Sequence, residues 1–311
     1  MSEIIKMIAS ELLMPFDKIQ HTIKFAPLKV KRFKIPKRSG GEREIIQPAG
    51  TLKPILSWID ASLLARLPVH KTATAFRPGK SILDNATAHS SSKYSVRVDI
   101  SGFFPSIRNT DITQVINAAK TTLPPWACEP ETLALISKVC FDINGRLPIG
   151  YSTSPSIANA VMFRIDSELT EEISKSVYFG EAVVTRYADD FVFSSDRAGA
   201  CKTFVQSLTK ILASSQSPTL SINSAKTRFM SRAGGSTLIT GLRVNNLGNV
   251  VVHASYRDHV RLLLKMYRSN NLKAGDVPKL VGHLAYVQHV DPAFFTKLSF
   301  KFHSEITRIR A

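Results

Sequence analysis

Residues 186–195 read RYADDFVFSS and place two adjacent aspartates, Asp189 and Asp190, between two short apolar segments. Neighbouring carboxylates repel each other, and Arg186 is the only positive charge within this stretch. The apolar residues on both sides follow the pattern that is typical of strands. The stretch therefore predicts a β-hairpin whose tip carries two negative charges that need a cation.

A third aspartate ends another predicted strand. In YSVRVDISGFF, residues 94–104, Val96 and Val98 alternate before Asp99. If the two strands are neighbours in one sheet, the three carboxylates meet at its edge, where their repulsion favours protonation unless a cation is bound. Oxygen ligands suit Mg²⁺, and two Mg²⁺ ions about 3.5–4 Å apart promote phosphoryl transfer. The alternative is structural, because Asp is a common residue in tight turns.

The composition favours a polyanionic partner. The 311 residues include 41 Lys and Arg against 24 Asp and Glu, a formal net charge of +17, so nucleic acid is the first candidate. No apolar run approaches the roughly 20 residues of a membrane-spanning helix, and the N-terminus lacks the pattern of a signal peptide. We therefore expect no membrane association and a cytoplasmic location. Cys128, Cys140 and Cys201 lack metal-ligand spacing and are expected to be reduced packing residues.

Helical and strand periodicities alternate along the chain in a manner typical of an α+β fold. One amphipathic helix is predicted at residues 3–19, and one long helix from Ser154 to about Ser174. A basic hairpin is predicted at 24–43, with its turn at Ser39, Gly40 and Gly41. Further helices are predicted at 52–66, 111–120, 131–141 and throughout 255–311. The pattern indicates one core, without a second independent one.

Several motifs in this order resemble those of reverse transcriptases. Tyr187-Ala188-Asp189-Asp190 resembles the YxDD box, and VRVDISGFF resembles the first metal motif of that family. Further similar segments are IPKRSGGER at 35–43, FRPGKS at 76–81, GRLPIGYSTSPSIAN at 145–159, LSINSAKT at 220–227 and LITGL at 238–242. NATAH at 85–89 and ITG at 239–241 resemble the NAxxH and VTG elements of bacterial retron reverse transcriptases.

The resemblance implies a right-hand polymerase with fingers, an antiparallel palm sheet and a helical thumb. The expected divisions are an N-terminal helical extension at 1–23, fingers with part of the palm at 24–98 and 110–182, palm at 99–109 and 183–254, and thumb at 255–311. It also implies that deoxynucleotides (dNTPs) are added to a primer on an RNA template.

Candidate site residues follow from the same resemblance. Catalysis is assigned to Asp99, Asp189 and Asp190, and two Mg²⁺ ions are assigned to these residues together with Ile100. The nucleotide site is assigned to Lys37, Arg43, Phe104, Gly150 and Lys226, with Phe104 as a steric gate against a ribose 2′-hydroxyl. RNA or primer contacts are assigned to Asn85, His89, Thr240, Gly241, Arg257, Arg261, Lys265 and Arg268. For the basic residues, Phe104, Asn85 and His89 the competing interpretation is structural: a solvated basic face, core packing, a helix cap or a half-buried histidine.

Two departures from familiar motifs have consequences. Ile149 stands where the family's LPQG box has glutamine, so one polar contact to the nucleotide is missing. The GKS at 79–81 is not a phosphate-binding loop of the ATPase type, because Thr74 replaces the required glycine.

Membership among retron enzymes implies more than polymerisation. It implies a structured RNA that serves as template and primer, a covalently linked RNA-DNA product (msDNA) started from a 2′-hydroxyl, and a companion effector protein in antiphage defence. Because no stretch remains for an RNase H or endonuclease domain, template removal is expected from another protein. A group II intron or diversity-generating reverse transcriptase, and a non-catalytic RNA-binding scaffold, remain as alternatives.

Overall fold

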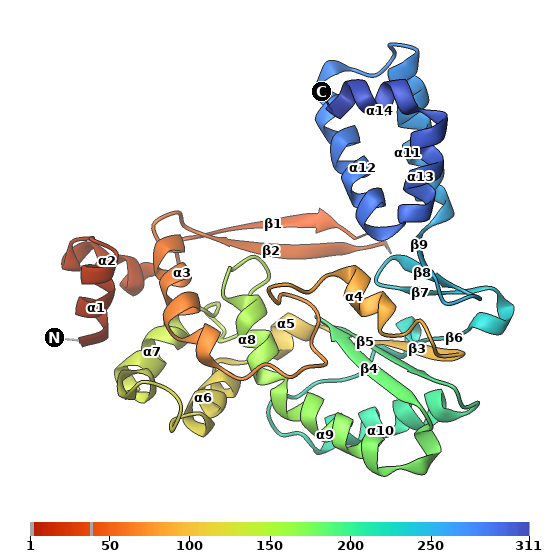
Figure 1. The fold of residues 1–311 in the computed structure, drawn as a ribbon. Coiled ribbons are helices and arrows are strands. Elements are labelled where there is room, and N and C mark those ends of the chain that lie inside the picture. The colour runs from red at the N-terminus through yellow and green to blue at the C-terminus, as the bar shows by residue number, and fades with distance from the viewer. Residues whose placement is uncertain (1–2, 38–39, 311) are drawn as a thin grey trace.

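A four-stranded antiparallel sheet lies at the centre of the structure, a computed structural model that describes residues 3–37 and 40–310 (Figure 1). Its strand order is β4-β5-β3-β6. The bounds are β3 Tyr94–Asp99, β4 Ala182–Tyr187, β5 Asp190–Ser195 and β6 Arg228–Ser231. The predicted hairpin at the aspartate pair is thus β4 and β5, and the strand that ends in Asp99 pairs directly with β5.

Two helices cover one face of this sheet. They are α9 (Phe163–Lys175), which precedes the short η3 (Val177–Phe179), and α10 (Ala200–Ser214), which follows β5 in the chain (Figure 1). Phe193 of β5 stacks on Phe204 of α10 with ring centroids 4.5 Å apart. Because strand side chains alternate, Asp190 points to the opposite face of the sheet from Phe193.

The N-terminal half supplies a long hairpin and a set of short helices. The hairpin joins β1 (Val30–Pro36) to β2 (Glu42–Pro48). Gly40 and Gly41 in its turn have φ values of 86° and 78°, whereas the expected turn residue Ser39 lies outside the described residues. The helices are α1 Glu3–Glu11, α2 Phe16–Phe25, α3 Lys53–Ser62, η1 Leu64–Arg66, α4 Ile82–Thr87, α5 Phe103–Ser106, α6 Asn109–Ala118, η2 Pro125–Cys128, α7 Pro130–Val139 and α8 Ser154–Val161.

Two predicted helices are each divided into two. The helix predicted at 3–19 is wrong as a single element, because Leu13 adopts a φ of 51° and Pro15 precedes α2. The long helix predicted from Ser154 is broken at Met162, between α8 and α9. Sequence periodicity continues across both breaks, which explains the error.

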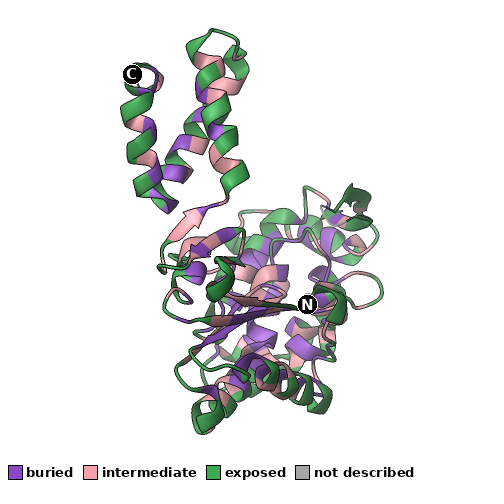
Figure 2. Cartoon of the chain, turned by 90° about the vertical axis from the view of Figure 1, so that its right-hand side faces the viewer, coloured by how far each residue is buried: buried purple, intermediate pink, exposed green. Residues whose placement is uncertain are grey.

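The C-terminal part is a small sheet followed by a helical bundle. After η4 (Ser224–Lys226) and η5 (Arg232–Gly234), the strands are β7 Ser236–Ile239, β8 Leu242–Asn245 and β9 Val250–Val252. The bundle comprises α11 Ala254–Arg268, η6 Ala274–Asp276, α12 Val277–Val290, α13 Pro292–Lys301 and α14 His303–Arg310. Figure 2 shows it standing away from the rest of the molecule. The helical C-terminus is as predicted.

The expectation of a single core is wrong. One buried cluster spans the N-terminal helices and the palm, and a second joins the bundle to β7, β8 and β9. Val192 of β5 belongs to the second cluster, which ties the bundle's base to the palm sheet. The predicted boundary between residues 98 and 99 falls inside β3, and the interval 110–182 includes α9, which packs on α10.

Two expectations from the sequence, about the cysteines and about membrane-spanning helices, concern the described part of the chain. Cys128, Cys140 and Cys201 are free, and the last two are buried. None of the helices within 3–37 and 40–310 is long and apolar enough to cross a bilayer.

Candidate active site

The register of the palm sheet brings the three predicted aspartates together. Asp99 and Asp190 are direct partners across β3 and β5, a position in which Cα atoms lie about 4.5–5.5 Å apart. The Ile100 amide donates a hydrogen bond to the carbonyl of Asp189 at 3.0 Å, which joins the hairpin tip to the end of β3. Ala188, the first residue of the turn, has a φ of 57°. A two-residue turn of this kind turns the chain sharply enough to place both aspartates at the sheet edge.

The environment of these carboxylates favours a bound cation. Burial raises the pKa of Asp190 to about 6, with Arg97 opposing the shift and Asp189 and Asp99 adding to it. Burial also raises the pKa of Asp189, and the charge of Asp99 contributes. The desolvation penalty on both groups would be relieved by a divalent ion.

Lys226 occupies part of the place where a cation is needed. Its Nζ lies 3.1 Å from both carboxylate oxygens of Asp99, and Asp99 is only 7% exposed. The Lys226 side chain itself is 46% exposed. The sequence predicted this lysine near the triphosphate, and the structure places it at the first catalytic strand.

The donor set fits a divalent metal. Within the described residues the Oδ1 atom of Asp190 is buried without a hydrogen-bond partner, since Nε of Arg97 is 3.7 Å away. In the described ranges no three His, Cys, Asp or Glu side chains already surround one point as metal ligands. The three carboxylates are therefore close together but do not surround one metal position. The ammonium group of Lys226 supplies positive charge beside Asp99.

Arg186 does not neutralise the aspartate pair, although it is their neighbour in sequence. Its side chain is fully buried and donates to both oxygens of Asp166 on α9, at 2.7–3.1 Å. One Nη atom also donates to Asn159 Oδ1 at 3.2 Å and to the Ala188 carbonyl at 3.1 Å. Arg186 therefore holds the catalytic turn in place through its hydrogen bond to the Ala188 carbonyl.

The hairpin of the fingers carries the two predicted triphosphate contacts. Both Lys37 and Arg43 are exposed, and the Lys37 amide donates to the Gly41 carbonyl at 2.9 Å. The positive charge of Arg43 lowers the pKa of Asp189, opposing the effect of burial. Arg43 therefore lies within electrostatic reach of the palm carboxylates.

Gly150 contacts the fingers hairpin. It has a φ of 121°, and a Cβ at this position would lie 2.7 Å from the carbonyl oxygen of Ile46. The Ile46 amide donates to the carbonyl of Ile149 at 2.8 Å. The backbone of Ile149 thus joins β2 to the loop before α8, even though its side chain lacks the family's amide.

Phe104 lies on α5, shortly after Asp99, and is half-buried. It packs edge-on against Phe103 at 5.3 Å and against Phe76 at 6.5 Å. Phe103 is 3% exposed and belongs to the core.

Asn85 and His89 of the NATAH element are buried, with 0% and 1% exposure. His89 is hydrogen-bonded to Ser194 and Thr185 of the palm hairpin, at 2.6 and 2.8 Å. Asn85 accepts from Thr74 at 3.0 Å and donates toward Thr240 at 3.4 Å. This placement differs from the expected direct contact with RNA, because both polar groups are engaged inside the protein.

Thr240 and Gly241 form the turn between β7 and β8, with φ values of 46° and 84°. The Thr240 hydroxyl donates to the Ile82 carbonyl at 3.2 Å. The NATAH and ITG elements, far apart in sequence, therefore contact each other. Gly241 is exposed and remains available to a primer.

The basic residues of α11 divide into two kinds. Arg257 pairs with Asp291, which is 2% exposed, at 2.6 Å. Arg268 pairs with Glu305 of α14 at 2.6 Å. The guanidinium groups of Arg257 and Arg261 lie over the ring of Phe294, and that of Arg268 lies over Phe302. A buried carboxylate therefore holds the guanidinium of Arg257, and the expected phosphate contact of this residue stays a prediction.

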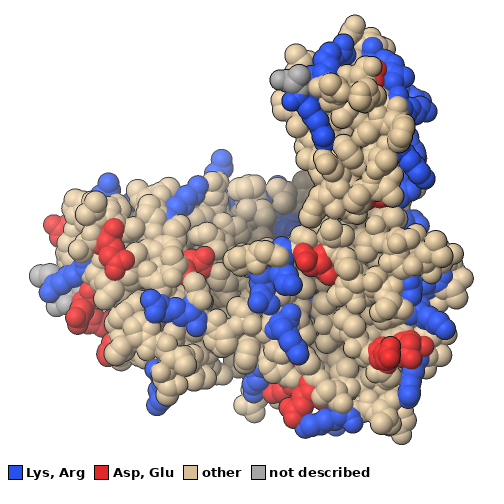
Figure 3. Space-filling model, in the orientation of Figure 1, with Lys and Arg blue, Asp and Glu red and all other residues tan. Residues whose placement is uncertain are grey.

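Lys265 is exposed on the same helix, and Arg261 is 46% exposed beside Asp258. Figure 3 shows Lys and Arg side chains along one margin of the helical bundle, with few acidic side chains on that face.

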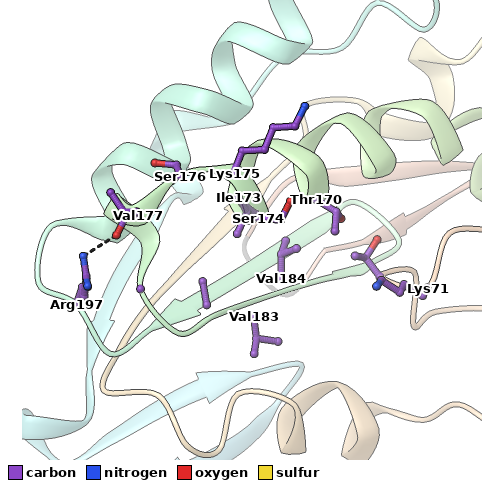
Figure 4. A pocket seen from close by; sticks show the side chains of 13 residues that line it. Lys71, Thr170, Ile173, Ser174, Lys175, Ser176, Val177, Val183, Val184 and Arg197 are labelled. Carbon is purple, nitrogen blue, oxygen red and sulfur yellow. Dashed lines mark hydrogen bonds between the residues drawn. The ribbon is translucent and has the colours of Figure 1, made fainter.

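A cavity of about 680 Å³ lies away from these residues, beside the end of β4 that is remote from Asp189 (Figure 4). Its lining includes Lys71, Lys175, Arg197 and Val183 and none of the predicted site residues.

Sequence reasoning missed Arg97 and the Asp166 network. The alternation of side chains along β3 places Arg97 on the same face of the sheet as Asp99. This alternation could have identified Arg97 from the sequence. The sequence around Asp166 did not indicate its role, because its partner Arg186 lies on another element, β4.

Comparison with known proteins identifies the class. The family of reverse transcriptases (RNA-dependent DNA polymerases) matches residues 35–268, so the chain belongs to that family and is an RNA-directed DNA polymerase with the right-hand fold. Apo telomerase from Candida tropicalis shares this fold, with a TM-score of 0.51, 12% identity and coverage of 92% of this chain and 62% of that one.

More similar relatives narrow the family to the retron reverse transcriptases, to which this chain belongs. It is 35% identical to the Retron Ec73 reverse transcriptase of Escherichia coli, over 92% of this chain and 90% of the relative. The Retron Ec83 reverse transcriptase of the same species is 29% identical over 88% and 86%. The Retron Mx162 reverse transcriptase of Myxococcus xanthus is 31% identical over 83% of this chain and 57% of the relative.

Proposed function

We propose that this retron reverse transcriptase extends its primer at Asp99, Asp189 and Asp190, with two Mg²⁺ ions held by these carboxylates and the backbone of Ile100. One observation carries the assignment: the direct pairing of Asp99 with Asp190, next to the hydrogen bond from Ile100 to Asp189. Bound Mg²⁺ would activate the primer hydroxyl and stabilise the departing pyrophosphate oxygen.

The protein's own groups then have separate tasks. Arg43 and Lys37 on the hairpin bind the triphosphate, Arg by a bidentate contact and Lys as a point charge. Lys226, which contacts Asp99, would release this carboxylate to a bound metal ion and neutralise the departing pyrophosphate, because an ammonium and a divalent cation compete for one carboxylate. Phe104 collides with a ribose 2′-hydroxyl, and Gly150 keeps the pocket's wall close to the hairpin.

For nucleic acid we propose contacts at Gly241, Arg261 and Lys265, which are exposed. Asn85, His89, Thr240, Arg257 and Arg268 would act indirectly by fixing the elements that carry those contacts. The template would be a structured non-coding RNA that also primes synthesis through a 2′-hydroxyl and remains joined to the DNA as msDNA. The relatives named as retron enzymes support this proposal.

We further propose a cytoplasmic bacterial role in antiphage defence with a companion effector protein. The support is membership among retron enzymes, together with a net charge of +17 that suits an enzyme held on nucleic acid.

Primer extension tests the active site. Purified protein, an RNA template, dNTPs and Mg²⁺ should give a DNA product, and Asp189→Asn should abolish it. Asp17→Asn, an exposed aspartate on α2, is the matched control and should retain full activity. Undiminished synthesis by Asp189→Asn would refute the site assignment.

Sequencing of nucleic acid that copurifies from cells carrying the native locus tests the retron-specific product. DNA covalently attached to RNA is expected with the wild type and not with Asp189→Asn. Recovery of plain RNA alone from active cells would contradict the msDNA proposal. Plating phage on the same two strains tests defence, since protection should require an active enzyme.

A further inference from the structure

Phe76 is an exposed aromatic residue with an unusual backbone. Its φ is 57°, and 52% of it is exposed to solvent. For a bulky residue that conformation is a genuine outlier, and such strain persists only where the surrounding structure enforces it. An exposed ring that is held at a conformational cost requires an explanation beyond packing.

The chain just before Phe76 is fastened to the palm. The Thr74 amide donates to the Arg186 carbonyl at 2.9 Å, and the Arg186 amide donates to the Thr72 carbonyl at 2.8 Å. Asn159 donates through Nδ2 to the Ala75 carbonyl at 3.0 Å. Arg186 and Asn159 are the same buried residues that support the catalytic turn. The position of Phe76 is therefore coupled to that of the catalytic hairpin.

The ring of Phe76 reaches Phe104. Their centroids are 6.5 Å apart and their planes are inclined by 68°, an edge-to-face contact. Phe104 also contacts the buried Phe103 at 5.3 Å and 76°. Phe104 thus contacts one core ring and one strained, exposed ring.

We propose that Phe76 is a positioning residue for sugar selection: it holds the ring of Phe104 in the place where a ribose 2′-hydroxyl would collide with it. This rests on the proposed function of Phe104 as the steric gate. A gate rejects ribonucleotides only when its ring cannot move aside, and the contact with Phe103 alone leaves one edge of Phe104 unsupported. The strained loop supplies the second support.

The test measures kcat/KM for a dNTP and for the matching ribonucleotide in primer extension. Phe76→Ala should reduce discrimination against the ribonucleotide roughly tenfold, the size of losing one aromatic contact, chiefly through a lower KM for the ribonucleotide. Phe76→Tyr keeps the ring and should restore discrimination. A merely structural role would lower both substrates' rates and leave their ratio unchanged, which would overturn the proposal.

Two glycine variants test whether a change in discrimination comes from a loss of stability. Phe76→Gly relieves the backbone strain, so its melting temperature should equal or exceed that of the wild type while discrimination falls. Leu13→Gly is the matched control, because Leu13 also has a positive φ, 51°, and is 91% exposed far from the palm. It should gain stability without any change in discrimination.

A Phe104→Val variant separates this inference from the proposed function. Lower discrimination in Phe104→Val and in Phe76→Ala supports both. Lower discrimination in Phe104→Val alone overturns the role of Phe76 and keeps the gate. Unchanged discrimination in Phe104→Val overturns the gate and, with it, the inference.

Discussion

Replacing Asp166 by alanine should destabilise the protein severely. Asp166 and Arg186 are both 0% exposed at their side chains, and three hydrogen bonds of 2.7–3.1 Å join them. Removal of the carboxylate leaves a guanidinium buried without its counter-charge, and breaking such a pair costs about 3–5 kcal/mol of unfolding free energy. Urea unfolding followed by circular dichroism measures this loss.

The control is Glu168→Ala on the same helix. Glu168 is 3.6 Å from Arg164, and their side chains are 44% and 58% exposed, so solvent screening should reduce the cost to about 0–1 kcal/mol. A similar small cost for Asp166→Ala would refute the reasoning that the buried pair supports the palm.

A double variant, Asp166→Leu with Arg186→Met, separates stability from activity. Two apolar residues of similar volume avoid a buried unpaired charge, so much of the stability should return. Primer extension should not return, because the Ala188 carbonyl loses the donor that lies 3.1 Å away. Full recovery of synthesis by the double variant would show that Arg186 does not position the catalytic turn.

Three further predictions concern other parts of the molecule. Burial lowers the pKa of His89 from 6.5 to about 4. Between these values the unfolded chain binds a proton that the folded chain does not, so this stabilisation is complete above pH 6.5 and falls by about 3 kcal/mol toward pH 4. Urea unfolding at pH 7 and 4.5 should show a weaker fall for His89→Gln, and an unchanged fall would contradict the assignment. Gly150→Ala should lower the melting temperature more than Gly79→Ala, since both have positive φ but only Gly150 meets backbone at 2.7 Å; equal effects would argue against the close packing. Arg257→Ala should lower stability by about 3 kcal/mol because it leaves the buried Asp291 carboxylate without its counter-charge, whereas Lys265→Ala should keep stability and reduce the salt dependence of RNA-DNA hybrid binding by about one unit of slope. Urea unfolding and binding titrations at several salt concentrations measure the two effects. A stability loss for Lys265→Ala and a lower salt slope for Arg257→Ala would contradict this prediction.

The local elements of the active site were predictable because their signals span only a few residues. Alternating apolar residues predicted β3, β4 and β5, and the two-residue spacing between strands predicted the hairpin turn that carries Asp189. The pairing of Asp99 with Asp190 was a hypothesis about distant strands, and the register of the sheet agrees with it. Helix ends were less accurate, because hydrophobic periodicity continues through the breaks at Leu13 and Met162.

By itself, the sequence determined the α+β class, the order of the motifs, the family resemblance and the placement of the catalytic aspartates at strand ends, since each depends on local periodicity or spacing. Only the tertiary structure decided what each polar side chain contacts. Arg186 pairs with Asp166, His89 is buried against the palm hairpin, and Arg257 pairs with the buried Asp291. The physical reason is that burial and pairing depend on how distant elements pack. A charge that looks solvated along the chain acquires its partner only when the helices and strands assemble.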